Sequence, residues 1–194
     1  MSPILSLDER IFHFCYNATG AGHLLPLMIA ASIVGSGWTM FALVPLLLRT
    51  DTRRWATALT VTLLATAVMV FSLKMAVGRT RPIFALAGVH PLYGSPTDFS
   101  FPSGHSAGSF ATAAFVSTVA WFRARREPAV AMAMYGISAV MVTLAVVIGY
   151  SRVYLGVHFP GDVLMGAVLG GSFGAAGGYV YATKLARDDV PGAD

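Results

Sequence analysis

The sequence predicts an all-α fold, a polytopic bundle of transmembrane helices with five long spans and a short N-terminal helix. Two observations predict this class. Of the 194 residues, 56% are hydrophobic and only 11% are charged, whereas about a quarter of the residues are charged in an average soluble domain. The apolar residues also gather in runs of about 20, the length that a helix needs to cross a bilayer. We therefore expect residues 1–194 to form a single integral-membrane domain.

The first predicted helix, Leu7–Asn17, is too short to cross a bilayer. Its apolar residues Leu7, Ile11 and Phe14 recur at helical spacing and fall on one face. An amphipathic segment of this kind is typical of a helix that lies in the membrane interface. A helix that packs on the end of the bundle is the alternative, and the sequence leaves both open.

Five long apolar runs follow, separated by polar turns. The predicted spans are Leu24–Leu48, Trp55–Val77, Gly104–Phe122, Ala129–Tyr150 and Pro160–Thr183. In the last span every fourth residue from Gly166 to Gly178 is glycine, which lets helix backbones approach closely. This glycine ladder predicts packing inside the bundle, with a dimer face as the alternative, so the oligomeric state stays open.

The positive charges orient the predicted bundle. Three basic clusters fall on one side of the five spans: Arg49, Arg53 and Arg54; Arg123, Arg125 and Arg126; and Lys184 with Arg187. The positive-inside rule makes this side cytoplasmic. Four further cations fall on the outer side and oppose the trend, which indicates that chemistry retains them: Lys74, Arg79, Arg81 and Arg152. Because the charges follow topology, the net charge of +4 does not indicate a nucleic-acid partner.

Polar residues at the outer ends of the spans predict an anion site. Lys74 and Arg81 are seven residues apart and share one helix face if the helix continues to Pro82. The N–H groups at the start of a helix bind anions, and an arginine donates two hydrogen bonds to a phosphate. The candidate phosphate ligands are Lys74, Arg81, Ser103, Gly104 and Arg152. Snorkelling of lysine and arginine at the interface is the alternative, but it does not explain the histidines nearby.

Two histidines add acid–base and nucleophilic chemistry to this face. His158 and Asp162 lie one helical turn apart around Pro160, which suits the first turn of a helix. A carboxylate beside one imidazole nitrogen fixes the tautomer and strengthens the other nitrogen as a nucleophile. His105 stands at the start of another span, where it is free to act as a general acid.

In order, the motifs are Lys-x6-Arg-Pro, Pro-Ser-Gly-His and Ser-Arg-x5-His-x3-Asp, and they run from Lys74 to Asp162 without a substitution. This three-part pattern resembles that of the type 2 phosphatidic acid phosphatase (PAP2) superfamily. The resemblance implies that His158 attacks phosphorus and forms a phosphohistidine, that Asp162 orients it, and that His105 protonates the leaving oxygen. The six-helix layout of that family fits if Leu7–Asn17 counts as the first helix.

The expected function is removal of a phosphate, as a monoester or a pyrophosphate, from a lipid at the outer face of a bacterial-type cytoplasmic membrane. The resemblance leaves phosphatidylglycerophosphate, phosphatidic acid, undecaprenyl pyrophosphate and a lipid A phosphate open as substrates. A non-catalytic lipid or anion transporter is the main alternative, although it needs no His–Asp pair beside a second histidine. A vanadate-dependent haloperoxidase shares the anion-site motif, but the known members are soluble and five apolar spans argue against it.

We expect no metal ion and no other cofactor. The chain has nine Asp and Glu residues, and only Asp98 and Asp162 lie near the predicted site. Since Asp162 pairs with His158, the one remaining carboxylate is a poor site for a divalent ion. The single Cys15 fits no metal spacing and forms no intramolecular disulfide.

The long loop Gly78–Phe101 lies beside the predicted site and is partly apolar. Long ordered loops are often lids, so this one is interpreted as a guide for the lipid headgroup or tail. Its charged residues Arg79 and Asp98 are interpreted as solvated loop charges. Three further histidines are interpreted as ordinary interface residues: His13, His23 and His90.

Overall fold

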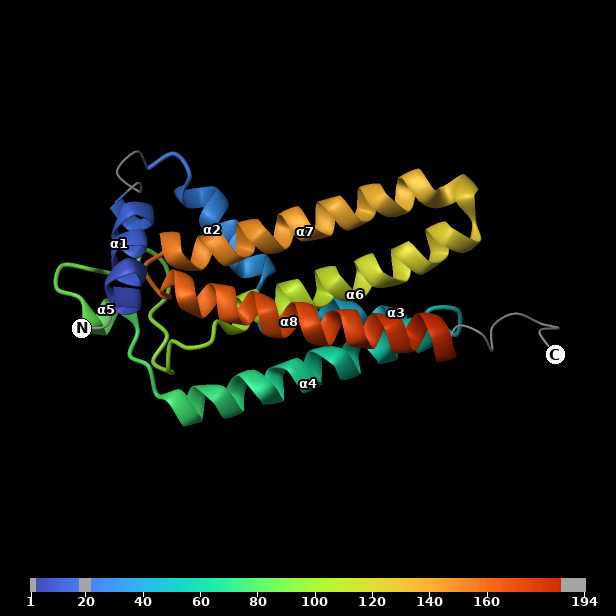
Figure 1. Cartoon of the computed structure of the whole chain (residues 1–194), viewed down its shortest axis with the longest axis horizontal. Helices are drawn as coiled ribbons and strands as arrows, with labels where there is room; N and C mark the ends of the chain where they lie inside the picture. Colours follow the sequence, from blue (N-terminus) through green and yellow to red (C-terminus); the bar gives the residue numbers. More distant parts are fainter. Residues whose placement is uncertain (1–2, 18–21, 186–194) are drawn as a thin grey trace.

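The computed structural model describes residues 3–17 and 22–185, and these residues contain helices and no strand. Four long helices lie side by side along one axis (Figure 1). They are α4 (Arg53–Val77), α6 (Gly104–Arg126), α7 (Ala131–Tyr154) and α8 (Pro160–Val180). The helix α6 occupies the centre, where it packs against the other three, most extensively against α8 and α7. The predicted all-α bundle is confirmed.

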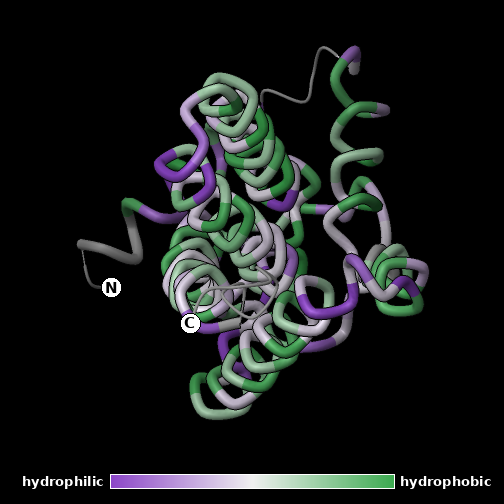
Figure 2. The backbone as a smooth tube through the Cα atoms, turned by 90° about the vertical axis from the view of Figure 1, so that its right-hand side faces the viewer, coloured by the Kyte–Doolittle hydropathy of each residue, from purple (hydrophilic) through white to green (hydrophobic). Residues whose placement is uncertain are grey.

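Three helical segments of the described chain are long and apolar enough to cross a membrane: Arg53–Ala85, Pro128–Tyr154 and Pro160–Lys184. The central helix α6 is not one of them, because its serines, threonines and terminal arginines lower its hydropathy. Outward-facing side chains of α4, α7 and α8 are large and apolar, including Val68, Val140 and Leu164, and Figure 2 shows apolar residues along the helices. An apolar outer surface of this kind is that of a bundle embedded in lipid.

The first predicted span is not one continuous helix. Leu24–Leu48 instead forms α2 (Leu25–Val34), the 3₁₀-helix η2 (Gly37–Leu43) and the short helix α3 (Val44–Leu48). At the break, the hydroxyl of Ser36 donates a hydrogen bond to the carbonyl of Ile33 at 2.6 Å and so replaces a helical backbone bond. The prediction of five continuous long spans is therefore not confirmed.

The glycine ladder of α8 faces α6. Gly166, Gly170, Gly174 and Gly178 are all buried. A Cβ atom at Gly170 would lie 2.0 Å from the carbonyl oxygen of Ala107, and one at Gly174 would lie 2.2 Å from that of Ala111. The ladder thus allows the two backbones to touch, which supports packing inside the bundle over a dimer face.

The N-terminal helix α1 (Pro3–Asn17) crosses one end of the bundle (Figure 1). Phe12 is completely buried and its ring lies 5.6 Å from that of Phe159 and 5.5 Å from that of Tyr16. The hydroxyl of Tyr16 donates to the carbonyl of His90 at 2.9 Å. Of the two alternatives for this segment, the structure therefore supports the helix packed on the bundle end.

Two short elements complete the fold. The loop after α4 contains the one-turn helix α5 (Pro82–Ala85), and the 3₁₀-helix η3 (Pro128–Val130) connects α6 to α7. After α8 the chain continues as a π-helical turn, η4 (Tyr181–Leu185). The loop between α4 and α6 lies at the same end of the bundle as α1 (Figure 1), and this end contains the polar residues described next.

Candidate active site

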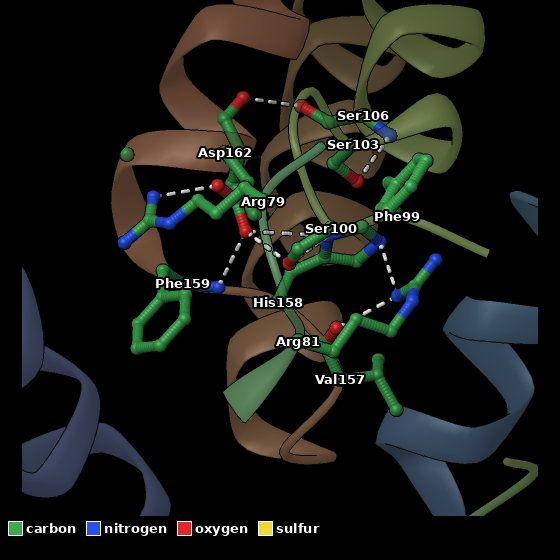
Figure 3. A network of polar contacts seen from close by, with 12 residues as sticks. Arg79, Arg81, Phe99, Ser100, Ser103, Ser106, Val157, His158, Phe159 and Asp162 are labelled. Carbon is green, nitrogen blue, oxygen red and sulfur yellow. Dashed lines mark hydrogen bonds and ion pairs between the residues drawn. The ribbon is translucent and has the colours of Figure 1, made fainter. Parts of the chain in front are cut away.

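The three sequence motifs meet at one end of the bundle, where α4 ends and where α6 and α8 begin (Figure 3). The structure buries the cations, the proposed nucleophile and its carboxylate together: Lys74, Arg81, Arg152, His158 and Asp162. Buried charges are costly unless they are paired or hydrogen-bonded. A cluster of this kind therefore indicates a functional site.

The end of α4 separates Lys74 from Arg81. Gly78 caps the helix in the left-handed conformation, with φ of 64°, and its N–H donates to the carbonyl of Lys74 at 3.0 Å. Arg81 follows in extended backbone before Pro82, as expected for a residue that precedes proline. The condition for both cations to share one helix face is not met, because the helix ends at Val77 and the loop returns Arg81 to the site.

Asp162 lies in the first turn of α8 and is completely buried. One oxygen, Oδ2, accepts hydrogen bonds from the backbone N–H of Phe159 at 2.9 Å and from the hydroxyl of Ser100 at 2.5 Å. The same oxygen lies 3.5 Å from Nδ1 of His158. The other oxygen, Oδ1, accepts from Nη1 of Arg79 at 2.7 Å. The predicted pairing of His158 with Asp162 is present, but Asp162 also binds three further donors.

Arg79 is not the solvated charge that the sequence suggested. Its guanidinium forms ion pairs with Asp162 at 2.7 Å and with Asp8 at 2.6 Å, and its side chain is 21% exposed. Its Cζ atom lies 4.1 Å from the centre of the Phe159 ring, a cation–π geometry. The two ion pairs and the contact with the Phe159 ring compensate for the hydration that the Arg79 guanidinium loses on partial burial.

Arg81 contacts His158 directly. Its Nη1 lies 3.0 Å from Nε2 of His158 and donates to the carbonyl of Val157 at 2.7 Å. Burial lowers the pKa of His158 to about 4, although its hydrogen bond to Asp162 acts in the opposite direction. His158 is therefore neutral at pH 7, as a nucleophile must be.

Asp98 was also interpreted as a solvated charge; its side chain is 55% exposed, but it is paired with two cations. Its carboxylate lies 2.9 Å from Nζ of Lys74 and 2.7 Å from Nη2 of Arg81. Backbone carbonyls of the same loop bind these cations too, since that of Asp98 accepts from Nε of Arg81 at 2.8 Å and that of Phe99 accepts from Lys74. Partial burial alone would raise the pKa of Asp98, but the hydrogen bonds and charges of Lys74 and Arg81 hold it below its usual range.

The start of α6 supplies two of the predicted ligands, Ser103 and Gly104. Ser103 is the N-cap, its hydroxyl accepts from the N–H of Ser106 at 3.4 Å, and its own N–H donates to the carbonyl of Asp162 at 3.0 Å. This last bond joins the start of α6 to the start of α8. Gly104 and His105 follow in the first turn and line a cavity described below.

Arg152 enters the site from the last turn of α7. Its Nη1 donates to the hydroxyl of Ser32 in α2. Its Nε is buried and has no hydrogen-bond partner among the described residues. A buried guanidinium donor without an acceptor is costly, so this N–H is available to donate to an anionic ligand.

Sequence reasoning missed Asp8, Ser32 and Ser100 as parts of the site. Ser100 stands three residues before Ser103, so its closeness to a motif was a usable signal. Asp8 and Ser32 carried none, because each lies in an otherwise ordinary helix and acts on residues far along the chain. The three histidines outside the motifs, His13, His23 and His90, are exposed, as expected.

A cavity of about 600 Å³ adjoins the cluster and extends between α2, η2, α4, α6 and α7. Lys74, Asp98 and His105 form its polar end. Its remaining walls are mostly apolar and include Leu59 and Ile148. Within the described residues no three His, Cys, Asp or Glu side chains gather as metal ligands do. The site thus combines a cationic cluster, two histidines and an adjoining apolar cavity.

Comparisons with known proteins agree on one family. The chain is 40% identical over 98 residues to phosphatidylglycerophosphatase B of Bacillus subtilis, which covers 50% of this chain and 44% of that protein. It is 32% identical over 145 residues to the undecaprenyl-diphosphatase of Sulfolobus acidocaldarius, covering 74% of this chain and 64% of that protein. The chain thus spans less than half the length of the Bacillus relative.

The fold agrees as well. The crystal structure of a transmembrane PAP2-type phosphatidylglycerolphosphate phosphatase from Bacillus subtilis superposes with a TM-score of 0.75 at 24% identity, covering 100% of this chain and 90% of that one. Residues 54–185 match the model of the PAP2 superfamily, a range that includes Lys74, Arg81, His105, His158 and Asp162. The chain therefore belongs to the PAP2 superfamily.

Proposed function

We propose that this chain is an integral membrane phosphatase that hydrolyses a phosphate monoester or pyrophosphate of a lipid through a phosphohistidine at His158. The observation that carries the proposal is the burial of three cations around a neutral histidine, beside an apolar cavity. Lys74, Arg81 and Arg152 bind the oxygens of one phosphate, together with the N–H groups at the start of α6.

Each step of the proposed reaction is assigned to a residue of the site. Nε2 of His158 attacks phosphorus, and the bond from phosphorus to the leaving oxygen breaks while His105, protonated beside the negatively charged phosphate, gives that oxygen a proton. The hydrogen on Nδ1 faces Asp162, which stabilises the positive charge that the ring gains. A water molecule then attacks the phosphohistidine, His105 takes its proton, and inorganic phosphate leaves. The cations stabilise the charge on the transferred group.

The adjoining cavity favours a lipid over a soluble phosphate ester. Its polar end contains Lys74 and His105, and its apolar walls extend away from them between the helices. A phosphate bound at the polar end would direct an attached hydrocarbon chain into the apolar part. The activities that name the relatives, on phosphatidylglycerophosphate and on undecaprenyl diphosphate, support the same class of substrate without choosing among its members.

The proposed orientation places the active site at the outer face of a bacterial-type cytoplasmic membrane. In this arrangement α6 and the broken segment of α2, η2 and α3 also cross the bilayer, and the basic turns lie in the cytoplasm. The exposed residues Thr50 and Ser95 test it when each is replaced by cysteine in a Cys15→Ser background. An impermeant thiol reagent added to intact cells should label Ser95→Cys and spare Thr50→Cys, and the reverse pattern would overturn the orientation.

Phosphate release by the purified protein tests the activity. The panel contains phosphatidylglycerophosphate, phosphatidic acid, undecaprenyl pyrophosphate and a lipid A phosphate in detergent, with His158→Ala as the inactive control. We expect wild-type turnover on at least one lipid and none with the variant. Absence of turnover on every lipid would instead favour the transporter, which keeps a cationic site but has no use for the His158–Asp162 pair.

A further inference from the structure

Arg79 joins the N-terminal helix to the carboxylate beside the proposed nucleophile. Its Nη1 donates to Oδ1 of Asp162 at 2.7 Å, and its Nη2 donates to Oδ2 of Asp8 at 2.6 Å. The Asp8 side chain is 12% exposed and that of Asp162 is fully buried. One guanidinium therefore spans two carboxylates, from helices at opposite ends of the sequence.

Asp8 is itself held in place by the start of α8. Its Oδ1 accepts a hydrogen bond from the N–H of Gly161 at 2.7 Å. A Cβ atom at Gly161 would lie 3.2 Å from Oδ2 of Asp8, so the glycine leaves room for this carboxylate. Burial of Phe12 against Phe159 fixes α1 one turn further along. The start of α8 thus fixes the position of Asp8, and Asp8 in turn contacts Arg79.

Oδ1 of Asp162 has Arg79 as its charged partner, while Oδ2 receives Ser100, the N–H of Phe159 and the ring of His158. Without a donor at Oδ1, the carboxylate plane could tilt about the Cβ–Cγ bond, which would take Oδ2 out of line with Nδ1 of His158. A guanidinium is rigid, planar and permanently charged, so it holds both the orientation and the negative charge of Asp162.

We infer that Arg79 is a positioning residue for Asp162, and that Asp8 of α1 holds Arg79 in the orientation that this requires. The inference rests on the proposed phosphatase function. Neither residue lines the adjoining cavity, and the proposed phosphate ligands are Lys74, Arg81 and Arg152. Their loss therefore affects the chemical step and leaves anion binding intact.

The test compares Arg79→Gln, Arg79→Lys and Asp8→Asn with wild-type protein in detergent, on the lipid that the wild type turns over best. A displaced catalytic group costs up to about 10²-fold, so Arg79→Gln should lower kcat by about that factor with an unchanged inhibition constant for inorganic phosphate. Arg79→Lys keeps the positive charge but cannot donate from two nitrogens to two carboxylates, so its kcat should lie between those of Arg79→Gln and the wild type. Asp8→Asn should cause a smaller loss in the same direction.

Coupling between the two residues separates positioning from a general loss of stability. If Asp8 acts through Arg79, the double variant Asp8→Asn/Arg79→Gln has the kcat of Arg79→Gln alone. The matched control is Glu9→Gln, which removes an acid from the same turn of α1; the described contacts of Arg79 and Gly161 include Asp8 but not Glu9. It should keep wild-type kcat. The rate at which acid-labile phosphoenzyme forms in a single turnover should fall in parallel with kcat.

Two results overturn the inference and can be told apart from failure of the proposed function. If the wild type turns over lipid and Arg79→Gln keeps its kcat, Arg79 has no positioning role. If Arg79→Gln lowers kcat only as far as thermal unfolding shows a loss of folded protein, its role is structural. A wild type that releases phosphate from no lipid overturns the phosphatase itself, and the inference with it.

Discussion

The guanidinium of Arg81 lies 3.0 Å from Nε2 of His158. An arginine side chain only donates hydrogen bonds, so Nε2 must accept, and the hydrogen of the neutral ring must be on Nδ1. That nitrogen faces Oδ2 of Asp162 at 3.5 Å. Arg81 and Asp162 thus select the tautomer whose free lone pair is on Nε2. In the proposed reaction, the phosphate oxygens would replace Nε2 as the acceptor of Arg81 and release the lone pair for attack.

The first prediction separates the two histidines of the site. His158→Ala should abolish turnover and any covalent phosphate, because it removes the attacking atom. His105→Ala should slow a poor leaving group by about 10²–10⁴-fold, the usual contribution of a general acid, and should affect nitrophenyl phosphate less. Rates on both substrates and acid-quenched trapping of labelled enzyme measure these effects. Labelled phosphate on the His158→Ala protein would show that another residue is the nucleophile.

The second prediction concerns Asp98, whose two carboxylate oxygens bind Lys74 and Arg81 as two phosphate oxygens would. An entering phosphate must displace this carboxylate, so Asp98→Asn should bind anions more tightly. Hydrogen bonds to charged groups contribute about 1.5–3 kcal/mol, so the inhibition constant for vanadate should fall by about tenfold or more. Asp51→Asn, a change at an exposed acid in a basic turn, is the control. Weaker vanadate binding by Asp98→Asn would mean that Asp98 orients the cations and does not compete with the ligand.

A third prediction follows from the low pKa of His158. Since the value in the fold is about 4 and that of free histidine is 6.5, the unfolded chain binds a proton more readily over this range. The free energy of unfolding therefore falls as the pH drops from about 6.5 towards 4, with a contribution of about 2 kcal/mol between pH 7 and pH 5. Thermal unfolding in detergent at both pH values should show a smaller difference for His158→Gln than for wild type. Equal differences for both proteins would contradict the neutral buried histidine.

Metal independence is the fourth prediction. Hydrolysis of phosphate monoesters is among the slowest uncatalysed reactions, so charge on the transferred group must be strongly stabilised. Lys74, Arg81 and Arg152 supply that charge, and Asp98 and Asp162 are already bound to Lys, Arg and Ser side chains. Activity in detergent should survive excess EDTA, and vanadate should inhibit it. Loss of turnover with EDTA that Mg²⁺ or Zn²⁺ restores would refute the cationic mechanism.

The fifth prediction tests the contact between α6 and α8. Gly170→Ala places a Cβ 2.0 Å from the carbonyl of Ala107, whereas a Cβ at Gly171 meets nothing within 4 Å. Overpacking of a close-packed contact costs about 1–3 kcal/mol, so Gly170→Ala should lower the thermal unfolding midpoint. Gly171→Ala should leave it unchanged or raise it slightly, since alanine favours a helix. Equal thermal unfolding midpoints for the two variants would mean that Gly170 does not lie in a close-packed contact between α6 and α8.

Properties encoded by neighbouring residues were predictable from the sequence, and properties encoded by distant contacts were not. The apolar runs of α4, α7 and α8 gave their positions to within a few residues, and Pro160 with Asp162 gave the start of α8. The site residues of the motifs come together because the motifs lie at helix ends on one side of the bundle. The break after Val34 was missed because Gly35 and Ser36 interrupt an apolar run without ending it.

Partners across the fold were the harder part. Arg79 and Asp98 looked solvated because both stand in a polar loop, and only the fold places carboxylates or cations against them. Asp8 was assigned to the N-terminal helix. Nothing near it in the sequence indicates that it contacts Arg79, which is 71 positions away in the chain. Pairings of this kind depend on how helices pack, which periodicity does not encode.

The bond between Asp8 and the N–H of Gly161 joins residues 153 positions apart. During synthesis α1 emerges first and α8 last, so the ribosome must deliver nearly the whole described chain before this bond forms. Until α8 has emerged, Arg79 lacks Asp162, and Asp8 lacks the N–H group that holds it. Contacts of such long sequence separation form late. The polar cluster at the bundle end is therefore complete only after the last helix has packed against the first.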